Sequence, residues 1–421
     1  MTTCEVNKPS DLFPAHLFTS HEREEALRNN IVLDWYFGHK EILEGITTPE
    51  LASFVDELRE LSEEDVARAA EKARKKSLLM TSIFLSGRCD ANCEICYTDR
   101  RVRETDLSIE EMKQVIKQTK ELGNKTIYIP GEGEPFLDKG LFSLLEFAKE
   151  LDQQVVIFTD GLLLSDEAQC QRILGRTLDE LFEAIREYPI YLYVKYWHSN
   201  RERFSTMMGV SPRQLQTARI TLRGGQTIDI PQGLLRLIEI APEKAGIETA
   251  VHSLNFDDVF QNLMPFVKQY GPKWYLEPII HSGRYSGRHD YDLTPEQHLK
   301  VSPYLTKQQC KRTGFSTVLM ATGHLSYCPS FVTNLSVKGA SALNEFSIRG
   351  DNPNEIRDLC SMLHSNEFIV KARYAAFTHF CLCDHLARKI EEGTTWEHLT
   401  ETLSATSEAT RSKAPLLSLT I

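Results

Sequence analysis

Several absences from the sequence narrow what the protein can be. No apolar run approaches the ~18 residues that a membrane-spanning helix needs. The first residues, MTTCEVNKPSDLF, lack a basic segment followed by an apolar core, so we expect no signal peptide. Positive charge is not in excess, because 48 Lys and Arg residues face 59 Asp and Glu residues, for a net charge of −11. We therefore expect no nucleic-acid or membrane partner and predict a cytoplasmic protein.

The composition is otherwise that of an ordinary globular protein. Hydrophobic residues make up 41% of the 421 residues and charged residues 25%. This length is too great for one small domain and predicts two or three units. Because no secretion signal is expected, the ten cysteines favour reduced thiols and metal ligands over disulfides.

Three of these cysteines fall within eight residues. Cys89, Cys93 and Cys96 have the spacing C-x3-C-x2-C, and so short a loop can place three thiolates around one metal centre. The apolar, β-branched run from Leu78 to Gly87 predicts a buried strand that leads into the loop. The thiols are therefore expected at the carboxyl end of a strand, where α/β barrels build their active sites. A zinc knuckle or buried thiols are the alternatives, although zinc sites more often use C-x2-C pairs.

Predicted strands and helices alternate along residues 80–285. The strands are expected near residues 78–87, 125–129, 155–159, 190–197, 247–254 and 274–280. The helices are expected near 106–122, where Ser108 and Glu111 form a capping box, and near 137–151, 178–188, 231–241 and 256–270. Six strands separated by helices predict a parallel sheet with crossover helices. Residues 198–230 interrupt this alternation and predict either a substrate loop or a surface ornament.

The two ends of the chain have other patterns. Residues 1–79 show helical spacing and no alternating strand pattern. They predict a helical extension that packs over the barrel, not a winged-helix module for peptide recognition. Within residues 286–421, the stretch VLMATGHLSYC predicts a β-hairpin around residues 321–324.

Two motifs resemble those of a known family. The cysteine triplet, with Ile95 and Tyr97 beside its last member, resembles the signature of the radical S-adenosylmethionine (SAM) superfamily. The stretch Gly131-Glu132-Gly133-Glu134-Pro135 after the second strand resembles that family's GGEP motif, with Glu132 in place of the first glycine. The resemblance implies a partial (β/α)6 barrel of the α/β class. It also implies a [4Fe-4S] cluster on the three cysteines, with SAM at the open iron.

The resemblance also suggests roles for single residues. Cofactor contacts are expected from Tyr97, Gly133, Glu134, Lys195 and Asn255, with His252 as a further candidate. Lys195 could equally be a solvated residue of an edge strand. Glu277, on the sixth predicted strand, could face the barrel mouth and is the candidate catalytic residue. The stretch HSGRYSGRH that follows could bind an anionic substrate through His281, Arg284 and Arg288, or could be a polar exit loop.

The cysteines of the last third resemble the SPASM and twitch extensions of radical SAM enzymes. The implied ligands of an auxiliary [4Fe-4S] cluster are Cys310, Cys328, Cys381 and Cys383. The number of cysteines fits one cluster of twitch type better than the two of a full SPASM domain. Cys360 is a reserve ligand, and a zinc site is the alternative.

The implied chemistry is reductive cleavage of SAM to a 5′-deoxyadenosyl radical, which abstracts hydrogen from the substrate. The electron is expected from a flavodoxin- or ferredoxin-type donor. We expect oxidation or rearrangement of a small polar molecule such as a sugar, an aminocyclitol or a nucleotide. A peptide- or protein-modifying maturase is the first alternative. A non-catalytic iron–sulfur or zinc-binding protein is the second.

Overall fold

The structure is a computed structural model that describes most of the predicted barrel. The described residues are 80–85, 87–98, 106–122, 124, 126–281, 283–285, 287–301, 304–305, 316–326, 347–350 and 356–359. The predicted helical extension over residues 1–79 lies outside them. The predicted ligands of the auxiliary cluster lie outside them too, namely Cys310, Cys328, Cys381 and Cys383.

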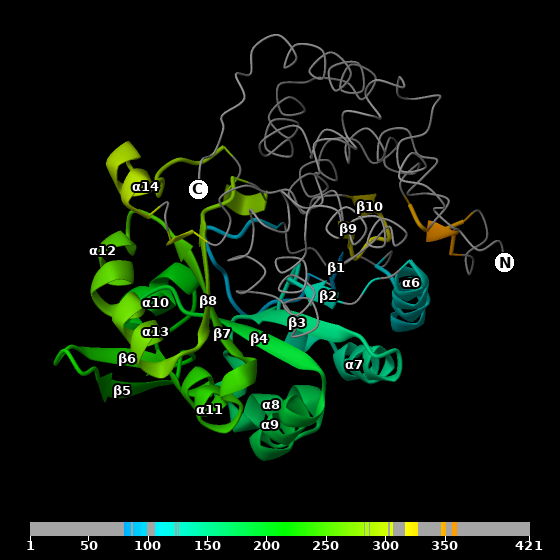
Figure 1. The fold of residues 1–421 in the computed structure, drawn as a ribbon, viewed down its shortest axis with the longest axis horizontal. Coiled ribbons are helices and arrows are strands. Elements are labelled where there is room, and N and C mark those ends of the chain that lie inside the picture. Colours follow the sequence, from blue (N-terminus) through cyan, green and yellow to red (C-terminus); the bar gives the residue numbers. More distant parts are fainter. Residues whose placement is uncertain are drawn as a thin grey trace, which may run out of the picture.

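One eight-stranded sheet forms the centre of the molecule (Figure 1). Its order is β10-β9-β1-β2-β3-β4-β7-β8, and every neighbouring pair from β9 to β8 is parallel. The six predicted strands are β1 (Met80–Ile83), β2 (Thr126–Ile129), β3 (Gln154–Thr159), β4 (Ile190–Lys195), β7 (Ala245–Val251) and β8 (Lys273–Pro278). The predicted α/β class and partial barrel are therefore confirmed.

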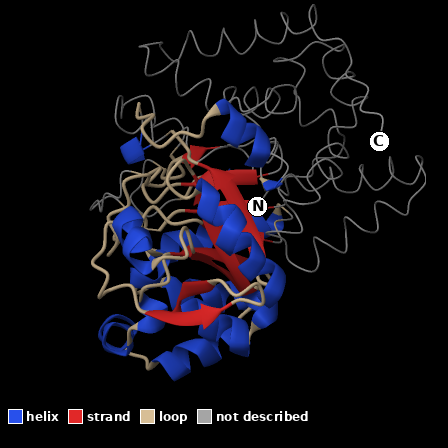
Figure 2. Ribbon diagram, turned by 90° about the vertical axis from the view of Figure 1, so that its left-hand side faces the viewer, coloured by secondary structure: helices blue, strands red, loops and turns tan. Residues whose placement is uncertain are grey.

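Helices connect the strands and pack around the sheet (Figure 2). The α-helices are α6 (Ile109–Glu121), α7 (Leu141–Glu150), α8 (Glu167–Leu174), α9 (Leu178–Glu187), α10 (Arg201–Met208), α11 (Gln232–Ile240), α12 (Phe256–Asp258), α13 (Met264–Tyr270) and α14 (Pro295–Val301). A π-helical segment, η5 (Val259–Leu263), joins α12 to α13, and the 3-10 turns are η2 (Pro135–Leu137), η3 (Leu163–Ser165), η4 (Pro242–Lys244) and η6 (Gly283–Tyr285). Within the described residues, no helix is long and apolar enough to cross a membrane.

Local sequence signals explain where several helices begin. The predicted capping box of α6 is present: the Ser108 hydroxyl accepts from the Glu111 N–H, and the Glu111 carboxylate accepts from the Ser108 N–H. Thr177 and Glu180 form the same pair at the start of α9. Each pair satisfies N–H groups that the first turn of a helix leaves without a partner. Helix α8 was not predicted, although Asp166 caps its first turn.

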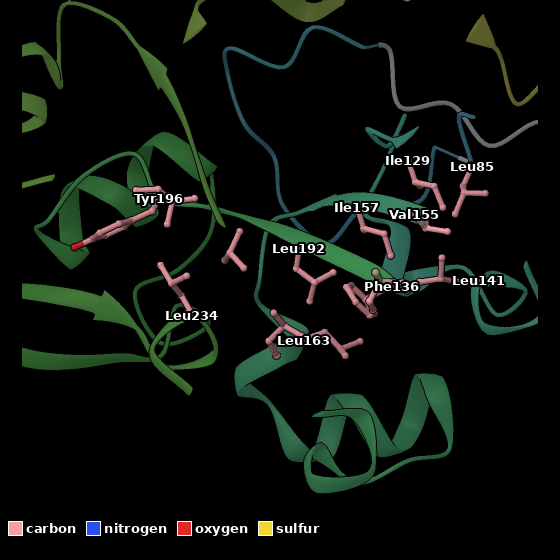
Figure 3. Packing of buried hydrophobic residues seen from close by; sticks show 14 of the residues in the cluster. Leu85, Ile129, Phe136, Leu141, Val155, Ile157, Leu163, Leu192, Tyr196 and Leu234 are labelled. Atoms are coloured by element: carbon pink, nitrogen blue, oxygen red, sulfur yellow. The ribbon is translucent and has the colours of Figure 1, made fainter. Parts of the chain in front are cut away.

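The hydrophobic core lies between the sheet and the helices (Figure 3). Ile157 of β3 and Leu192 of β4 are buried on the same side of the sheet, where they join Phe136 and Leu141. Burial of one such side chain stabilises the fold by about 1.5–3 kcal/mol. This packing holds the strands in register and thereby positions the loops at their carboxyl ends.

Alternate residues on the strands line the interior of the barrel. Phe158 of β3 stacks on Tyr193 of β4, with ring centroids 5.1 Å apart, and Tyr275 of β8 packs edge-on against Phe158 at 5.3 Å. Because side chains alternate along a strand, Lys195 shares a face with Tyr193, and Glu277 shares a face with Tyr275. The interior therefore changes from aromatic to charged towards the carboxyl ends of the strands.

Two segments add to the six-stranded pattern. Residues 198–230 contain α10 and a separate hairpin of β5 (Thr217–Thr221) and β6 (Thr227–Pro231). The hairpin predicted around residues 321–324 forms from β9 (Ser316–Leu319) and β10 (Leu325–Ser326). Strand β9 also pairs with β1 in parallel, so this hairpin extends the central sheet (Figure 1).

Candidate active site

Cys89, Cys93 and Cys96 lie in the loop that leaves the carboxyl end of β1. Cys93 is buried, whereas Cys89 and Cys96 are half-buried. The Cys96 N–H donates to the Cys93 carbonyl at 3.3 Å, which closes a turn between these two residues. The Cys96 sulfur lies 3.3 Å from the Thr98 hydroxyl oxygen. The three thiols therefore lie at the mouth of the barrel, within one short loop.

The segment after β2 packs directly against this cysteine loop. The Glu134 N–H donates to the Arg88 carbonyl at 2.8 Å. A Cβ on Gly133 would lie only 2.0 Å from the same carbonyl oxygen. We expected this glycine to let the backbone approach a ligand, but its close approach in the structure is to the cysteine loop. Only glycine allows the two backbones to come so near each other.

Two other segments also hold the cysteine loop. The Asn92 N–H donates to the Met208 carbonyl at the end of α10, at 2.8 Å. After β8, the Arg284 N–H donates to the Cys96 carbonyl at 3.0 Å, and its guanidinium donates to the Cys93 carbonyl at 3.3 Å. Arg284 was a candidate for anion binding, but these bonds commit it to the cysteine loop. The loop is thus held from three sides.

Glu134 is buried and accepts three hydrogen bonds. Its Oε1 accepts from the Phe136 N–H at 3.0 Å and from the Thr159 hydroxyl at 2.8 Å, and its Oε2 accepts from the Asp160 N–H at 2.7 Å. Burial raises the pKa of the Glu134 carboxyl to about 7, although these hydrogen bonds oppose the rise. The side chain thus ties the end of β2 to the end of β3.

A pair of carboxylates, Asp90 and Asp160, lies beside Cys89. Ligand atoms of Cys89, Asp90 and Asp160 all lie within 4.8 Å of one another. One oxygen of Asp160 accepts from the Leu162 N–H at 3.0 Å, and one oxygen of Asp90 accepts from the Gln169 amide at 2.8 Å. The other oxygen of each carboxylate is buried and has no hydrogen-bond partner among the described residues. Burial raises the pKa of the Asp160 carboxyl, and nearby carboxylates raise it further.

Lys195 provides positive charge in this group. Its Nζ lies 3.9 Å from the Cys93 sulfur and 4.9 Å from the centre of the Trp197 ring. Burial alone would lower the pKa of Lys195, but the charges of Cys93, Glu248 and Asp160 raise it more strongly. Glu248 in turn accepts from the Trp197 indole N–H at 3.1 Å. The lysine is therefore a half-buried cation that faces the barrel interior on the central strand β4, not a solvated edge residue.

These residues fit an iron–sulfur cluster. Burial, aided by the charge of Asp160, raises the pKa of the Cys89 thiol to about 12, so the thiol keeps its proton until a metal displaces it. Thiolates are the ligands that iron–sulfur clusters take. Carboxylate oxygens without partners next to Cys89 fit the ammonium group of a bound amino acid. Hereafter, the mouth group means Cys89, Asp90, Glu134, Asp160 and Lys195.

Asn255, a predicted cofactor contact, is bonded to the backbone around it. Its Nδ2 donates to the carbonyls of Trp197 and Ala250, both at 2.9 Å, and its Oδ1 accepts from the His252 N–H at 2.8 Å. Both amide hydrogens are therefore used by the backbone, and the side chain ties the end of β4 to the end of β7. Only a second lone pair on Oδ1 is left for a cofactor.

His252 is buried just after β7. Its Nδ1 accepts from the Leu254 N–H at 3.3 Å, which puts the ring hydrogen on Nε2. Nε2 has no hydrogen-bond partner among the described residues. Burial, aided by the charge of His198, lowers the pKa of His252 to about 4, so the ring is neutral near pH 7.

The two remaining predicted residues, Tyr97 and Glu277, also lie at the carboxyl ends of the strands. The Tyr97 hydroxyl lies 3.5 Å from the Gly131 carbonyl oxygen, so it links the cysteine loop to the segment after β2. Glu277 is half-buried at the penultimate position of β8 and pairs in register with Ala250 of β7.

Sequence reasoning assigned no site role to three carboxylates, namely Asp90, Asp160 and Glu248, and one of them had a usable signal. Glu248 is the one charged residue of the buried strand β7, and a buried charge in such a strand points to a partner inside the barrel. Asp90 has no signal of its own beyond its place next to Cys89. It lies close to Asp160 only because the loop after β1 meets the loop after β3.

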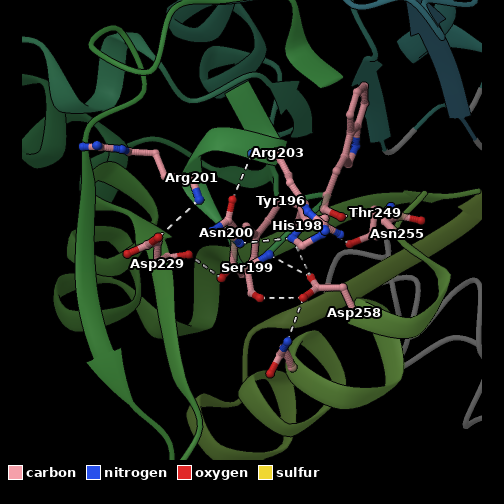
Figure 4. A network of polar contacts seen from close by, with 12 residues as sticks. Tyr196, His198, Ser199, Asn200, Arg201, Arg203, Asp229, Thr249, Asn255 and Asp258 are labelled. Atoms are coloured by element: carbon pink, nitrogen blue, oxygen red, sulfur yellow. Dashed lines mark hydrogen bonds and ion pairs between the residues drawn. The ribbon is translucent and has the colours of Figure 1, made fainter. Parts of the chain in front are cut away.

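A second buried polar network was also missed (Figure 4). Asp258 of α12 accepts from the Ser199 N–H at 2.7 Å, from the Ser199 hydroxyl at 2.5 Å and from the Asn262 amide at 2.7 Å. His198 lies 3.4 Å from Asp258, but its Nδ1 accepts from the Asn200 N–H, so this contact is not an ion pair. We call His198, Ser199, Asp258 and Asn262 the flank network.

Comparison with known proteins gives a family match that lies within the barrel. Residues 83–212 match the radical SAM superfamily. A GTP 3′,8-cyclase of Parasynechococcus marenigrum (strain WH8102) is 30% identical over 114 residues, which are 25% of this chain and 33% of that protein. The match thus spans about a third of the relative's length.

Solved structures resemble the fold more widely. Streptococcus suis SuiB bound to the precursor peptide SuiA has a TM-score of 0.50 at 16% identity, over 75% of this chain and 72% of that chain. The enzyme anSMEcpe with AdoMet and a Kp18Cys peptide has a TM-score of 0.45 at 15% identity, over 70% and 83%. At this identity the likeness to SuiB is one of fold. Residues 83–212 are therefore similar to the radical SAM superfamily, and the fold of the barrel agrees with that match.

Proposed function

We propose that the protein is a radical SAM enzyme in which Cys89, Cys93 and Cys96 hold a [4Fe-4S] cluster. The cluster and SAM, when bound, supply a 5′-deoxyadenosyl radical that removes a hydrogen atom from the substrate. Lys195 provides a positive charge beside the thiolate of Cys93. Three backbone contacts hold the cysteine loop in place, and the barrel wall excludes water from the reacting atoms.

The mouth group carries this proposal. Three thiols in one loop adjoin two carboxylate oxygens that have no hydrogen-bond partner among the described residues. A buried carboxylate oxygen without a partner is costly, so the arrangement favours a ligand with cationic N–H groups. The ammonium group of SAM has this chemistry. Asp90 and Asp160 would hold it, and Glu134 would keep the ends of β2 and β3 in place.

The test is reconstitution with iron and sulfide under anaerobic conditions, followed by assay of 5′-deoxyadenosine with dithionite. The protein should bind iron and form 5′-deoxyadenosine from SAM. Cys93→Ser should lose the formation of 5′-deoxyadenosine and the share of the iron that this cluster holds. Cys170→Ser is the matched control, because Cys170 is a buried thiol of α8 far along the chain from the cysteine loop. Equal iron contents and equal activity in the two variants would refute the proposal.

We further propose an auxiliary [4Fe-4S] cluster on Cys310, Cys328, Cys381 and Cys383, which rests on the resemblance of these cysteines to the SPASM and twitch extensions. Two clusters correspond to about eight iron atoms per chain and one cluster to about four. Cys328→Ser should therefore lower the iron content by about half and leave the cluster of the barrel in place. A parent protein with about four iron atoms per chain would contradict this second site.

We propose a small polar substrate, with a nucleotide as the first class to test. The support is the 30% identity to a protein named for its action on GTP. A peptide is the alternative, because SuiB, which has the same fold, was seen with a precursor peptide. Formation of 5′-deoxyadenosine, driven by a flavodoxin or ferredoxin, should rise with nucleotides and not with peptides. The reverse result would favour a maturase.

A further inference from the structure

A second group of metal-binding side chains lies in the loop between β8 and α14. His281, His289 and Asp292 each offer a ligand atom, and these atoms lie within 4.8 Å of one another. The two imidazole rings lie close together, with centroids 4.8 Å apart. The mouth group and the flank network share no residue with this trio.

Hydrogen bonding fixes which nitrogen of His281 is available. Its Nδ1 lies 2.9 Å from the Arg288 carbonyl oxygen, which can only accept, so Nδ1 carries the hydrogen. In the neutral ring, Nε2 then has a lone pair, and it lies 3.1 Å from a carboxylate oxygen of Asp292. Two acceptors at this distance repel each other unless a cation lies between them. Donation from the far ring nitrogen to a carbonyl is the usual arrangement of a metal-bound histidine.

The distances suit a small divalent ion. Bonds of about 2.0–2.2 Å from zinc to nitrogen and oxygen place tetrahedral ligands about 3.3 Å apart. The His281 Nε2 lies 3.1 Å from one oxygen of Asp292, and the His289 Nδ1 lies 2.8 Å from the other. The ion needs only small shifts of the His289 side chain, which is 74% exposed. Water can fill the fourth position from the open side.

The surrounding charges allow a cation at this place. The nearest cation along the loop is Arg288, and its guanidinium is bound to Asp290 at 2.6 Å and to Glu94 at 3.4 Å. The same loop reaches the cysteine loop through the Tyr291 hydroxyl, which donates to Glu94 at 2.5 Å. An ion at Asp292 would therefore brace the segment that holds the cysteine loop.

We propose that His281, His289 and Asp292 form a zinc site with water as the fourth ligand. The full-length protein, reconstituted with its iron, is dialysed to equilibrium against micromolar zinc chloride, and zinc and iron per chain are counted by mass spectrometry. The parent should bind one zinc per chain at this site. His289→Ala and Asp292→Asn should lower the affinity by more than about tenfold, because even outer-shell partners are worth about 10–100-fold.

His298→Ala is the matched control, since His298 is an exposed histidine of the neighbouring α14 outside the trio. It should bind zinc like the parent. His289 is exposed, so its variant should fold, which the iron count checks independently. Two results would overturn the site. The parent protein could bind no more zinc than a buffer sample without protein contains, or the His289→Ala protein could bind zinc as tightly as His298→Ala. Either result would mean that a proton on the His281 Nε2, and not a metal ion, lies between His281 and Asp292.

Discussion

The mouth group and the flank network are both buried carboxylate sites, but they differ in how completely their oxygens are bonded. In the flank network, Asp258 accepts three hydrogen bonds of 2.5–2.7 Å from Ser199 and Asn262. In the mouth group, Asp90 and Asp160 each have one oxygen without a partner among the described residues. The same residue type therefore serves the fold in one place and leaves binding capacity in the other.

The difference teaches how a functional site can be told from a structural one. A fully bonded network stabilises the fold and needs nothing more. A buried oxygen left without a partner in the protein is costly, so a bound ligand or an ordered water is expected to supply the missing hydrogen bond. His252, with an unpartnered Nε2, belongs with the mouth group on this criterion. Mutation of Asp258 should then mainly lower stability, whereas mutation of Asp160 should mainly weaken ligand binding.

The largest effect on stability is expected from Asp258→Ala. The change leaves the Ser199 N–H, the Ser199 hydroxyl and the Asn262 amide without their acceptor. We expect a loss of about 3 kcal/mol or more in the free energy of unfolding, at about 1–3 kcal/mol for each buried group. Urea unfolding followed by circular dichroism measures it. Asp257→Ala, an exposed neighbour in α12, is the control. Equal losses in the two variants would show that the hydrogen bonds of Asp258 do not stabilise the fold.

The next effect is a pH dependence from His252. Its pKa is lowered from 6.5 to about 4, so between these values the unfolded chain binds a proton that the folded chain does not. Stability should therefore fall as the pH falls from 6.5 to 4, by about 3 kcal/mol in total. In His252→Gln this contribution should vanish, whereas His298→Gln should keep it. Acid unfolding profiles that coincide for all three proteins would show that His252 does not titrate in this way.

A smaller loss is expected from Gly133→Ala. The new Cβ would meet the Arg88 carbonyl oxygen and push the cysteine loop away from the segment after β2. We expect a loss of about 1–3 kcal/mol, as for other overpacked sites, together with weaker iron binding. Gly224→Ala is the control, because its Cβ would meet only the flexible end of Gln226. Thermal unfolding and iron content of both variants decide the question.

The smallest effect on stability is expected from Asp160→Asn, which should nevertheless weaken the binding of SAM. Burial raises the pKa of the Asp160 carboxyl, so a neutral amide should leave stability unchanged or raise it by up to about 1 kcal/mol near neutral pH. SAM affinity should fall by about tenfold or more, since a hydrogen bond to a charged group contributes about 1.5–3 kcal/mol. Calorimetry of SAM binding tests this, with Asp257→Asn as control. A destabilised variant with normal affinity would place Asp160 with the structural residues.

Much of the fold could be predicted because its signals are local. The apolar runs before the cysteines and at residues 155–159 predicted strands, and Ser108 with Glu111 predicted the start of α6. The hairpin of residues 316–326 was predicted from its turn, but its parallel pairing with β1 was not. That pairing joins residues more than two hundred positions apart, and no local pattern encodes it. The auxiliary cluster and the extension over residues 1–79 stay predictions.

The candidate site likewise contains residues that local signals predicted and residues that they did not. Cys89, Cys93 and Cys96 could be predicted because one short loop carries all three thiols. The roles of Gly133, Arg284 and Asn255 could not, since each depends on a carbonyl from another loop.

Spacing and periodicity were enough to indicate the parallel sheet with crossover helices and the cysteine loop, and the resemblance to a known family added the partial barrel. Only the tertiary structure distinguished Asp160, which has an oxygen without a partner, from Asp258, which has none to spare. The physical reason is that hydrogen bonds to a buried carboxylate come from strands and loops far apart in the chain. Whether such a carboxylate is satisfied is therefore decided when those segments meet.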